Sequence, residues 1–142
     1  MHFSTFSQIR EKITSGDTSL PEIVKHYIHN IENDNDEINA VVSIDKEAAL
    51  ERAREVQQRI EEGTAGKLAG MVVGIKDLIV EQDKQATCAS HILENFESVY
   101  DATVVQRLLD EDAILLGRLN MDEFAMGSST ENSIYGPTRN PV

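Results

Sequence analysis

The stretch Leu68-Ala69-Gly70-Met71-Val72-Val73-Gly74-Ile75-Lys76-Asp77-Leu78-Ile79-Val80 is the most apolar part of the chain. Residues 71–75 form a nearly continuous run of the kind found in strands that are buried on both faces of a sheet. Lys76 ends this run, and a charged residue is costly to bury in such a place. We therefore predict a buried strand whose last residue is Lys76.

One strand and two helices are predicted before this run. Ser19 and Glu22 have the spacing of a capping box, and apolar residues follow them at helical spacing. The acidic segment 33–36 is expected to end that helix, and residues 38–44 have the pattern of a strand. Asp45 can cap the next helix, whose end is predicted near Gly63. The predicted buried stripe of this second helix comprises Ala48, Ala49, Ala53, Val56 and Ile60.

A further helix and strand are predicted after the apolar run. Asp101 is placed to cap a helix that carries Val104, Val105, Leu108 and Leu109. Residues 114–116 form another short apolar strand, which Gly117 is expected to close. This alternation of helices and strands predicts an α/β fold in which helices cover a sheet.

Length and charge exclude several classes of protein. The 142 residues suffice for one domain with a core, and no apolar run reaches the ~20 residues that span a bilayer. The net charge is −12, from 25 acidic and 13 basic residues, which disfavours unaided binding to a nucleic acid backbone. Cys88 is the only cysteine, so no internal disulfide forms and a reducing, cytoplasmic setting is expected.

Lys76 is the sharpest single signal for chemistry. Burial disfavours the charged form of a lysine, and a lysine that loses its proton near neutral pH can act as a general base. Asp77 is expected to point to the opposite face, because adjacent strand residues alternate. Position alone favours the alternative that Lys76 extends into solvent at the strand end.

Cys88 and the loop around Ser128 are weaker candidates. Cys88 stands beside hydroxyl residues and could be a nucleophile, but the sequence favours the interpretation as a small packed thiol in a turn. Gly127, Ser128 and Ser129 offer hydroxyls and backbone N–H groups that can bind anions or polar groups, or can merely form a turn.

No metal or dinucleotide site is predicted. His26 and His29 have a spacing that two ligands can use, but no third ligand is evident, so both are expected to be surface residues. The chain contains neither a phosphate-binding loop nor a dinucleotide fingerprint.

Several blocks in colinear order resemble the amidase signature family. They are Leu68-Ala69-Gly70, Gly74-Ile75-Lys76-Asp77 and Thr87-Cys88-Ala89-Ser90. Residues 92–96, 100–105, 120–132 and 136–141 are similar to one branch of it, the A subunits of aspartyl/glutamyl-tRNA amidotransferases. The resemblance runs from about Ser19 to the last residue. It implies the amino-terminal part of the amidase-signature fold, an incomplete mixed sheet covered by helices.

The resemblance also implies a catalytic triad of two serines and a lysine, in which one serine has a cis peptide geometry. Lys76 aligns with that lysine and would be the general base. The two serines belong to a glycine- and serine-rich segment that follows residues 140–141 in relatives. Residues 1–142 are therefore expected to be the amino-terminal portion of an amidase domain, truncated before that segment. Gly127, Ser128 and Ser129 would lie near the substrate pocket.

Members of this branch hydrolyse glutamine and use the ammonia to amidate mischarged Glu-tRNA(Gln) or Asp-tRNA(Asn). The resemblance thus implies a carbon–nitrogen ligase of protein biosynthesis, in a heterotrimer with B and C subunits. Glutamine and charged tRNA would be its further partners. ATP and Mg²⁺ would serve the full complex, and this chain would bind no cofactor. We expect the isolated chain to be inactive.

Two alternatives remain open. The chain could belong to a general amidase that acts on another carboxamide. It could also be a non-catalytic interaction module, because an incomplete sheet exposes an edge and apolar patches through which chains associate.

Overall fold

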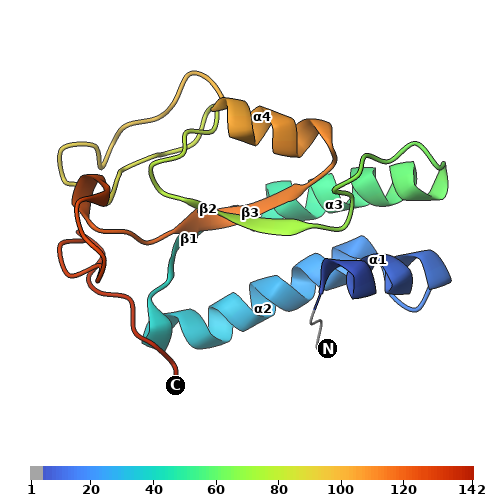
Figure 1. Cartoon of the computed structure of the whole chain (residues 1–142), viewed down its shortest axis with the longest axis horizontal. Coiled ribbons are helices and arrows are strands. Elements are labelled where there is room, and N and C mark those ends of the chain that lie inside the picture. Colours follow the sequence, from blue (N-terminus) through green and yellow to red (C-terminus); the bar gives the residue numbers. More distant parts are fainter. Residues whose placement is uncertain (1–4) are drawn as a thin grey trace.

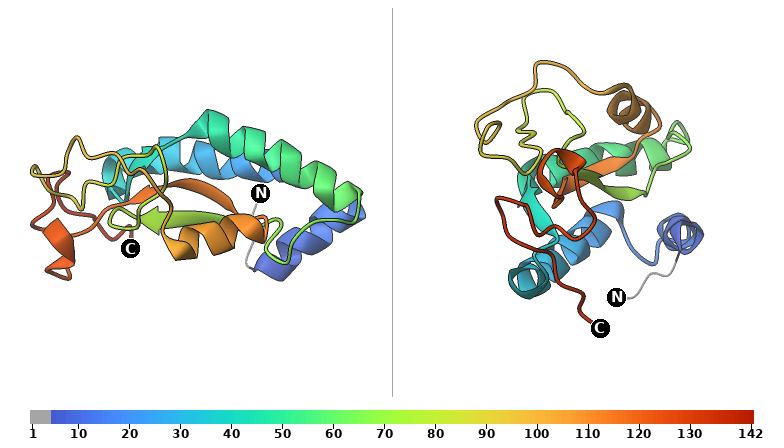
Figure 2. Two further views of the ribbon diagram at one scale, coloured as in Figure 1. Left: turned by 90° about the horizontal axis from the view of Figure 1, so that it is seen from above. Right: turned by 60° about the vertical axis from the view of Figure 1, so that its left-hand side comes forward.

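The computed structural model describes residues 5–142 and has an α/β fold. The elements are α1 (Phe6–Ser15), α2 (Leu20–Ile38), β1 (Val41–Ile44), α3 (Lys46–Glu61), β2 (Val72–Lys76), α4 (Thr103–Asp110), β3 (Ile114–Leu119) and the short 3-10 helix η1 (Glu123–Ala125). Helices α2 and α3 lie together on one side of the sheet, and α4 lies on the other (Figures 1 and 2). The predicted fold class is therefore confirmed.

The three strands form a mixed sheet in the order β1-β3-β2. β3 is central, antiparallel to β1 and parallel to β2. The prediction that residues 71–75 are buried on both faces is wrong for this chain, because Val72 and Val73 are half-buried and Gly74 is exposed. Within residues 5–142, β2 is an edge strand of this sheet.

Helix α2 is longer than predicted and continues through the acidic segment to Ile38. Residues 33, 34 and 36 are exposed, so their polar side chains stay in water while the helix continues. The helix ends at Asn39, which adopts a left-handed conformation with φ 55°. Asn35 fixes the exit, because its Oδ1 accepts hydrogen bonds from the backbone N–H groups of Ala40 and Val41 at 3.0 and 2.8 Å.

The predicted caps of α2 and α3 are confirmed. The Glu22 carboxylate accepts a hydrogen bond from the Ser19 N–H at 2.9 Å, within a complete capping box. Asp45 accepts one from the Ala48 N–H at 3.0 Å. Gly63 follows α3 with φ 71°, a conformation that favours glycine.

Two local predictions are wrong. Asp101 does not cap α4, because its carboxylate accepts a hydrogen bond from the Gln82 N–H at 2.7 Å and Ala102 is the residue before the helix. Ala48 is exposed, since it lies in the first turn of α3, away from the face that Ala49, Ala53 and Val56 bury.

The core lies between the helices and the sheet. Its fully buried side chains come from α2, α3, α4 and β3 and include Leu20, Ile23, Val24, Val56, Val105 and Ile114. Among residues 5–142, no helix combines the length and the apolar character needed to cross a membrane.

Gly117 does not close β3 but lies inside it, where β1 passes very close. A Cβ atom at Gly117 would be 2.5 Å from the Ser43 carbonyl oxygen and 2.7 Å from Ile44 Cγ2. Backbone cannot move aside as a side chain does, so Gly117→Ala should lower the free energy of unfolding by about 2–3 kcal/mol in a urea titration.

Gly74→Ala is the matched control for this prediction. A Cβ atom at Gly74 would meet only the Leu119 side chain, at 2.9 Å. That side chain can rotate away, so we expect a loss below about 1 kcal/mol. Equal losses in the two variants would contradict the predicted clash with β1.

Candidate functional site

Lys76 is the last residue of β2. It lies at the end of the sheet where the segments that follow the parallel strands β2 and β3 meet. Because β2 and β3 are parallel, their carboxyl ends point the same way. The loop after β2 and the segment after β3 lie side by side at this end, at the left of Figure 1. Ligands of open α/β sheets bind at such ends.

The Lys76 side chain is exposed. The sequence led us to expect that the Lys76 amine is buried, but residues 5–142 do not bury it. Asp77 points into the protein and is only 1% exposed, as strand alternation predicted. The role of Lys76 as a general base remains a prediction that needs a further covering surface.

Asp77 connects Lys76 to the block 87–89. Its Oδ1 accepts a hydrogen bond from Arg118 Nε at 3.0 Å. Its Oδ2 accepts hydrogen bonds from Thr87 N, Thr87 Oγ1 and Ala89 N at 3.2, 2.5 and 3.3 Å. The Asp77 carbonyl oxygen accepts a further one from the Cys88 N–H at 3.0 Å. The backbone beside Lys76 is thus held by a buried carboxylate.

Arg118 is a residue that our reading of the sequence missed. It is only 5% exposed, and its Nη2 donates a hydrogen bond to the Ile79 carbonyl oxygen at 2.6 Å. Its Nη1 lies 3.8 Å from Glu81 Oε2, and burial raises the pKa of Glu81 against the opposing effect of Arg118. A charged residue in the apolar strand Ile114–Leu119 was the signal that could have revealed a buried ion pair.

Cys88 has the surroundings of a packed thiol. Burial, assisted by the negative charge of Asp77, raises the pKa of the thiol, and Arg118 opposes this only in part. A reactive cysteine needs a lowered pKa. The Cys88 carbonyl oxygen accepts a hydrogen bond from the Phe124 N–H at 3.0 Å, which joins the loop after β2 to the segment after β3. The geometry therefore favours the structural interpretation of Cys88.

The loop 122–132 is organised around Asp122, a second residue that our sequence reasoning missed. Asp122 is 4% exposed and accepts hydrogen bonds from the N–H groups of Ser129, Thr130 and Asn132 at 3.0, 2.8 and 3.2 Å. These bonds, led by that from Thr130, lower the pKa of Asp122, and the charge of Lys76 contributes. An aspartate three residues after a strand and before a glycine- and serine-rich turn was the available signal.

The three predicted substrate-binding residues lie on this loop, and all are exposed. The backbone N–H of Ser129 is already bound to Asp122, and its hydroxyl donates to Glu131 Oε2 at 3.0 Å. Gly127 packs directly against the Asp122 carboxyl group. The sequence suggested that backbone N–H groups of this loop could bind a ligand. In the structure, those of Ser129 and Thr130 bind the Asp122 carboxylate of the same loop. Ser128 and the outer surface of the loop face solvent.

Two side-chain bonds link the loops further. The fully buried Ser90 donates its hydroxyl hydrogen to Glu123 Oε1 at 2.6 Å. Thr87 Oγ1 lies 3.0 Å from the Tyr135 hydroxyl oxygen. Four segments, 76–79, 87–90, 118–124 and 129–135, are therefore joined at one end of the sheet.

His26 and His29 lie near side chains of their own helix. Nε2 of His26 is 3.4 Å from Asn30 Nδ2, and Nε2 of His29 is 2.8 Å from Asn33 Nδ2. Within residues 5–142, no group of three or more potential metal ligands gathers at one place.

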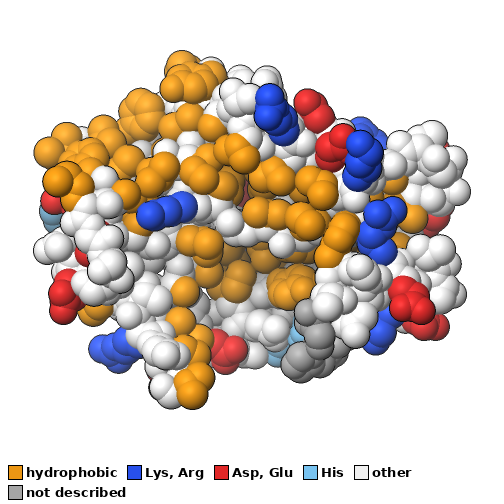
Figure 3. All heavy atoms as spheres, in the orientation of Figure 1, with side chains coloured by type: hydrophobic (Ala, Val, Ile, Leu, Met, Phe, Trp, Pro, Cys, Tyr) orange, Lys and Arg blue, Asp and Glu red, His pale blue; other side chains and the backbone are white. Residues whose placement is uncertain are grey.

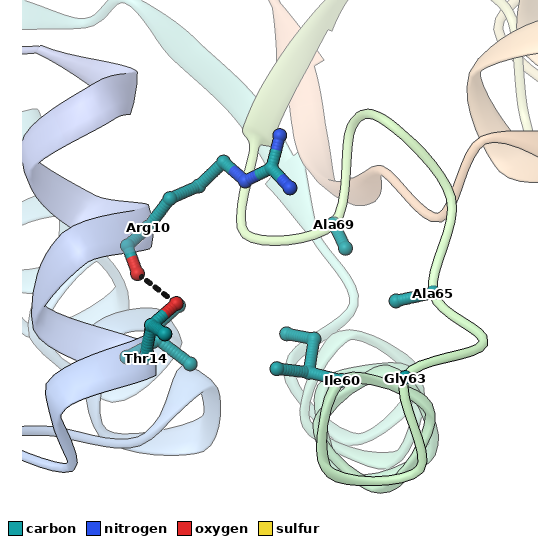
Figure 4. Close-up of a pocket in the computed structure, with 7 residues that line it drawn as sticks. Arg10, Thr14, Ile60, Gly63, Ala65 and Ala69 are labelled. Carbon is teal, nitrogen blue, oxygen red and sulfur yellow. Dashed lines mark hydrogen bonds between the residues drawn. The ribbon is translucent and has the colours of Figure 1, made fainter.

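A separate hollow lies at the other end of the molecule, between α1 and the end of α3 (Figure 4). Its lining includes Arg10, Thr14, Ile60 and Ala69. Arg10 Nη1 donates a hydrogen bond to the Lys67 carbonyl oxygen at 3.2 Å, and Thr14 donates to the Arg10 carbonyl oxygen at 2.8 Å. The lining contains no carboxylate or thiol, so this hollow does not compete with the Lys76 end as a catalytic site.

Comparison with known proteins decides the family. Residues 22–142 match the family model described as Amidase. The chain belongs to the amidase family. It is 50% identical over 142 residues to the A subunit of glutamyl-tRNA(Gln) amidotransferase from Chlorobium phaeobacteroides (strain DSM 266), covering 99% of this chain and 30% of that relative. The chain thus spans about a third of the length of the curated relatives it matches.

Solved structures of the amidase family agree. A bacterial aryl acylamidase of the amidase signature family matches with a TM-score of 0.86 and 29% identity, covering 99% of this chain and 30% of that one. The A subunit of glutamyl-tRNA(Gln) amidotransferase from Thermotoga maritima matches with a TM-score of 0.68 and 34% identity, covering 99% and 29%. The amidase-signature fold that the sequence blocks implied is confirmed.

Proposed function

We propose that this chain is the amino-terminal portion of the A subunit of a glutamine-hydrolysing amidotransferase. In that role Lys76 is the general base, and two serines from the remainder of the amidase domain complete the triad. The ammonia released amidates Glu-tRNA(Gln) or Asp-tRNA(Asn) with ATP and Mg²⁺, in a cytoplasmic heterotrimer with B and C subunits. The observation that carries the proposal is the 50% identity to one such A subunit along the whole chain.

The exposed apolar surface supports an incomplete domain. Hydrophobic side chains gather over the face of the molecule between α4 and α2 (Figure 3). An apolar groove there is lined by residues of α2 and all three strands, among them Ile31, Val72, Leu116 and Leu119. Val99 and Val104 are 83% and 49% exposed on the neighbouring loop and helix. Monomeric proteins rarely expose contiguous apolar surface of this kind.

A chimera tests the proposed function. Residues 1–142 would replace the matching segment of the Chlorobium A subunit, which would be purified with its B and C subunits. We expect this complex to release ammonia from glutamine and to amidate Glu-tRNA(Gln), whereas the isolated chain does neither. Both reactions need a triad, and of the proposed one this chain contains only Lys76. Turnover by the isolated chain would contradict its proposed inactivity.

The same chimera distinguishes the amidotransferase from the first alternative, a general amidase that acts on another carboxamide. The aryl acylamidase match favours testing other amides, because that enzyme shares the fold at 29% identity. A chimera that hydrolyses aryl acylamides and leaves glutamine intact would support a general carboxamide amidase in place of the amidotransferase.

The second alternative, a non-catalytic interaction module, is favoured by the exposed apolar face itself. Sedimentation of the isolated chain distinguishes the two views. Self-association without binding to the companion subunits, together with an inactive chimera, would support the module.

A further inference from the structure

The Asp122 carboxylate is surrounded by backbone of its own loop. Its Oδ2 accepts hydrogen bonds from two successive N–H groups, those of Ser129 and Thr130, and its Oδ1 accepts one from Asn132. Three N–H donors on one carboxylate satisfy groups that a compact turn cannot bond within itself. The conformation of residues 129–132 therefore depends on one side chain that lies outside the turn.

Gly127 brings the start of the turn into contact with the same carboxyl group. A Cβ atom at this position would lie 2.5 Å from Asp122 Cγ and 2.7 Å from its Oδ2. Only glycine allows the backbone to approach this closely. Both ends of the turn, at Gly127 and at Asn132, are thus gathered against Asp122.

Lys76 pairs with Leu119 of β3, three residues before Asp122, and the Asp77 N–H donates a hydrogen bond to the Leu119 carbonyl oxygen at 3.1 Å. The positive charge of Lys76 helps to lower the pKa of Asp122, after the larger effect of the backbone hydrogen bonds. The turn that carries Ser128 and Ser129 is consequently held next to the proposed catalytic base.

We propose that Asp122 is a positioning residue that holds the turn 127–132 beside Lys76. The ionised carboxylate takes the N–H groups of the turn and leaves the Ser128 side chain and the outer surface free to contact a substrate. Describing this turn as substrate-binding rests on the proposed function, whereas the anchoring itself does not.

Hydrogen exchange of the backbone amides in the full 142-residue chain tests the anchoring. In Asp122→Ala, the amides of Ser129, Thr130 and Asn132 should exchange roughly tenfold faster or more, because they lose this acceptor. Asp122→Asn keeps one side-chain oxygen and replaces the other by an NH2 group. The single oxygen can take the place of Oδ2, which binds Ser129 and Thr130, or of Oδ1, which binds Asn132, but not both. Either the Ser129 and Thr130 amides or the Asn132 amide should then stay protected. Leu116 in β3 should keep its native exchange rate in both variants.

Glu131→Gln is the matched control, because Glu131 is an exposed carboxylate in the same turn that binds the Ser129 hydroxyl and none of the three amides. It should leave the three amides unchanged. Native exchange rates in Asp122→Ala would overturn the proposal, as would equal acceleration in Glu131→Gln. If Asp122→Ala does not fold, the split pattern in Asp122→Asn decides, and uniform protection of all three amides there overturns the anchoring.

A titration followed by NMR tests the coupling to Lys76. The amide signals of Ser129 and Thr130 should move together as Asp122 is protonated, at a pH below the ordinary aspartate value of 3.8. Lys76→Met should raise that midpoint, since removing a nearby positive charge favours the protonated acid. Lys67→Met, at the other end of β2, should not. An unchanged midpoint in Lys76→Met, or equal shifts in both, would overturn the placement beside Lys76. Neither the exchange experiment nor the titration needs catalysis. Both can therefore succeed or fail independently of the proposed glutamine-hydrolysing function.

Discussion

An Arg118→Met variant is expected to lower the free energy of unfolding by about 3–5 kcal/mol. Methionine fills much of the space of the arginine stem, but it leaves the Asp77 carboxylate, 1% exposed, without its charged partner. The Ile79 carbonyl oxygen also loses its hydrogen bond from Nη2. Urea denaturation of the purified chain measures this loss. The effect is large compared with the total stability of about 5–15 kcal/mol of a typical domain.

Two further variants show whether the pair is the cause. In Asp77→Leu with Arg118→Met, no charge of the pair stays buried, so the double variant should lose clearly less than the sum of the single losses. Arg107→Met changes an exposed arginine of α4 and should alter stability by no more than about 0.5 kcal/mol. Additive losses in the double variant would show that the two side chains act independently.

The second large effect concerns catalysis. In the chimera described above, Lys76→Met should reduce the rate of ammonia release from glutamine by about 10²–10⁴-fold, the range for loss of a general base. Methionine keeps a similar length and removes the amine. In the isolated 142-residue chain the Lys76 side chain is exposed at the strand end, so there the same substitution should change stability by less than about 0.5 kcal/mol. Ammonia release with glutamine as substrate measures the rate, and thermal unfolding measures the stability.

The matched control is Lys67→Met, an exposed lysine before the start of β2. It should retain the parental rate. A Lys76→Met chimera with more than about a tenth of the parental activity would show that another group takes the proton. A raised KM with kcat unchanged would instead indicate a role in substrate binding.

Local patterns in the sequence predicted the local features of the fold. The capping box at Ser19, the cap at Asp45 and the strand that ends at Lys76 all depend on residues within a few positions of one another. Predictions failed where distant segments compete. Residues 33–36 were expected to end α2, but residues 33, 34 and 36 extend into solvent, Asn35 bonds the backbone of residues 40 and 41, and the helix ends only at Asn39. The apolar run was expected to be buried on both faces, but β3 takes the middle of the sheet and β2 lies at its edge within residues 5–142.

The candidate site divides in the same way. Lys76 and the loop at 127–129 were predicted from residue types and family resemblance, and the structure brings both to one end of the sheet. From the sequence, the loop N–H groups could either bind a ligand or merely form hydrogen bonds within a turn. They are bound instead to Asp122, seven to ten positions earlier in the chain. Residue types show that such groups exist, but only folding decides which acceptor reaches them.

The sequence alone determined the family, the α/β alternation and the position of Lys76 at a strand terminus, because each is encoded in contiguous residues or in colinear blocks. Only the tertiary structure decided that Asp77 pairs with Arg118, 41 positions away, and that Asp122 accepts hydrogen bonds from the backbone of Ser129, Thr130 and Asn132. The physical reason is that a buried charge is stable only next to a partner. The partner is supplied by whichever strand or loop the fold packs against it.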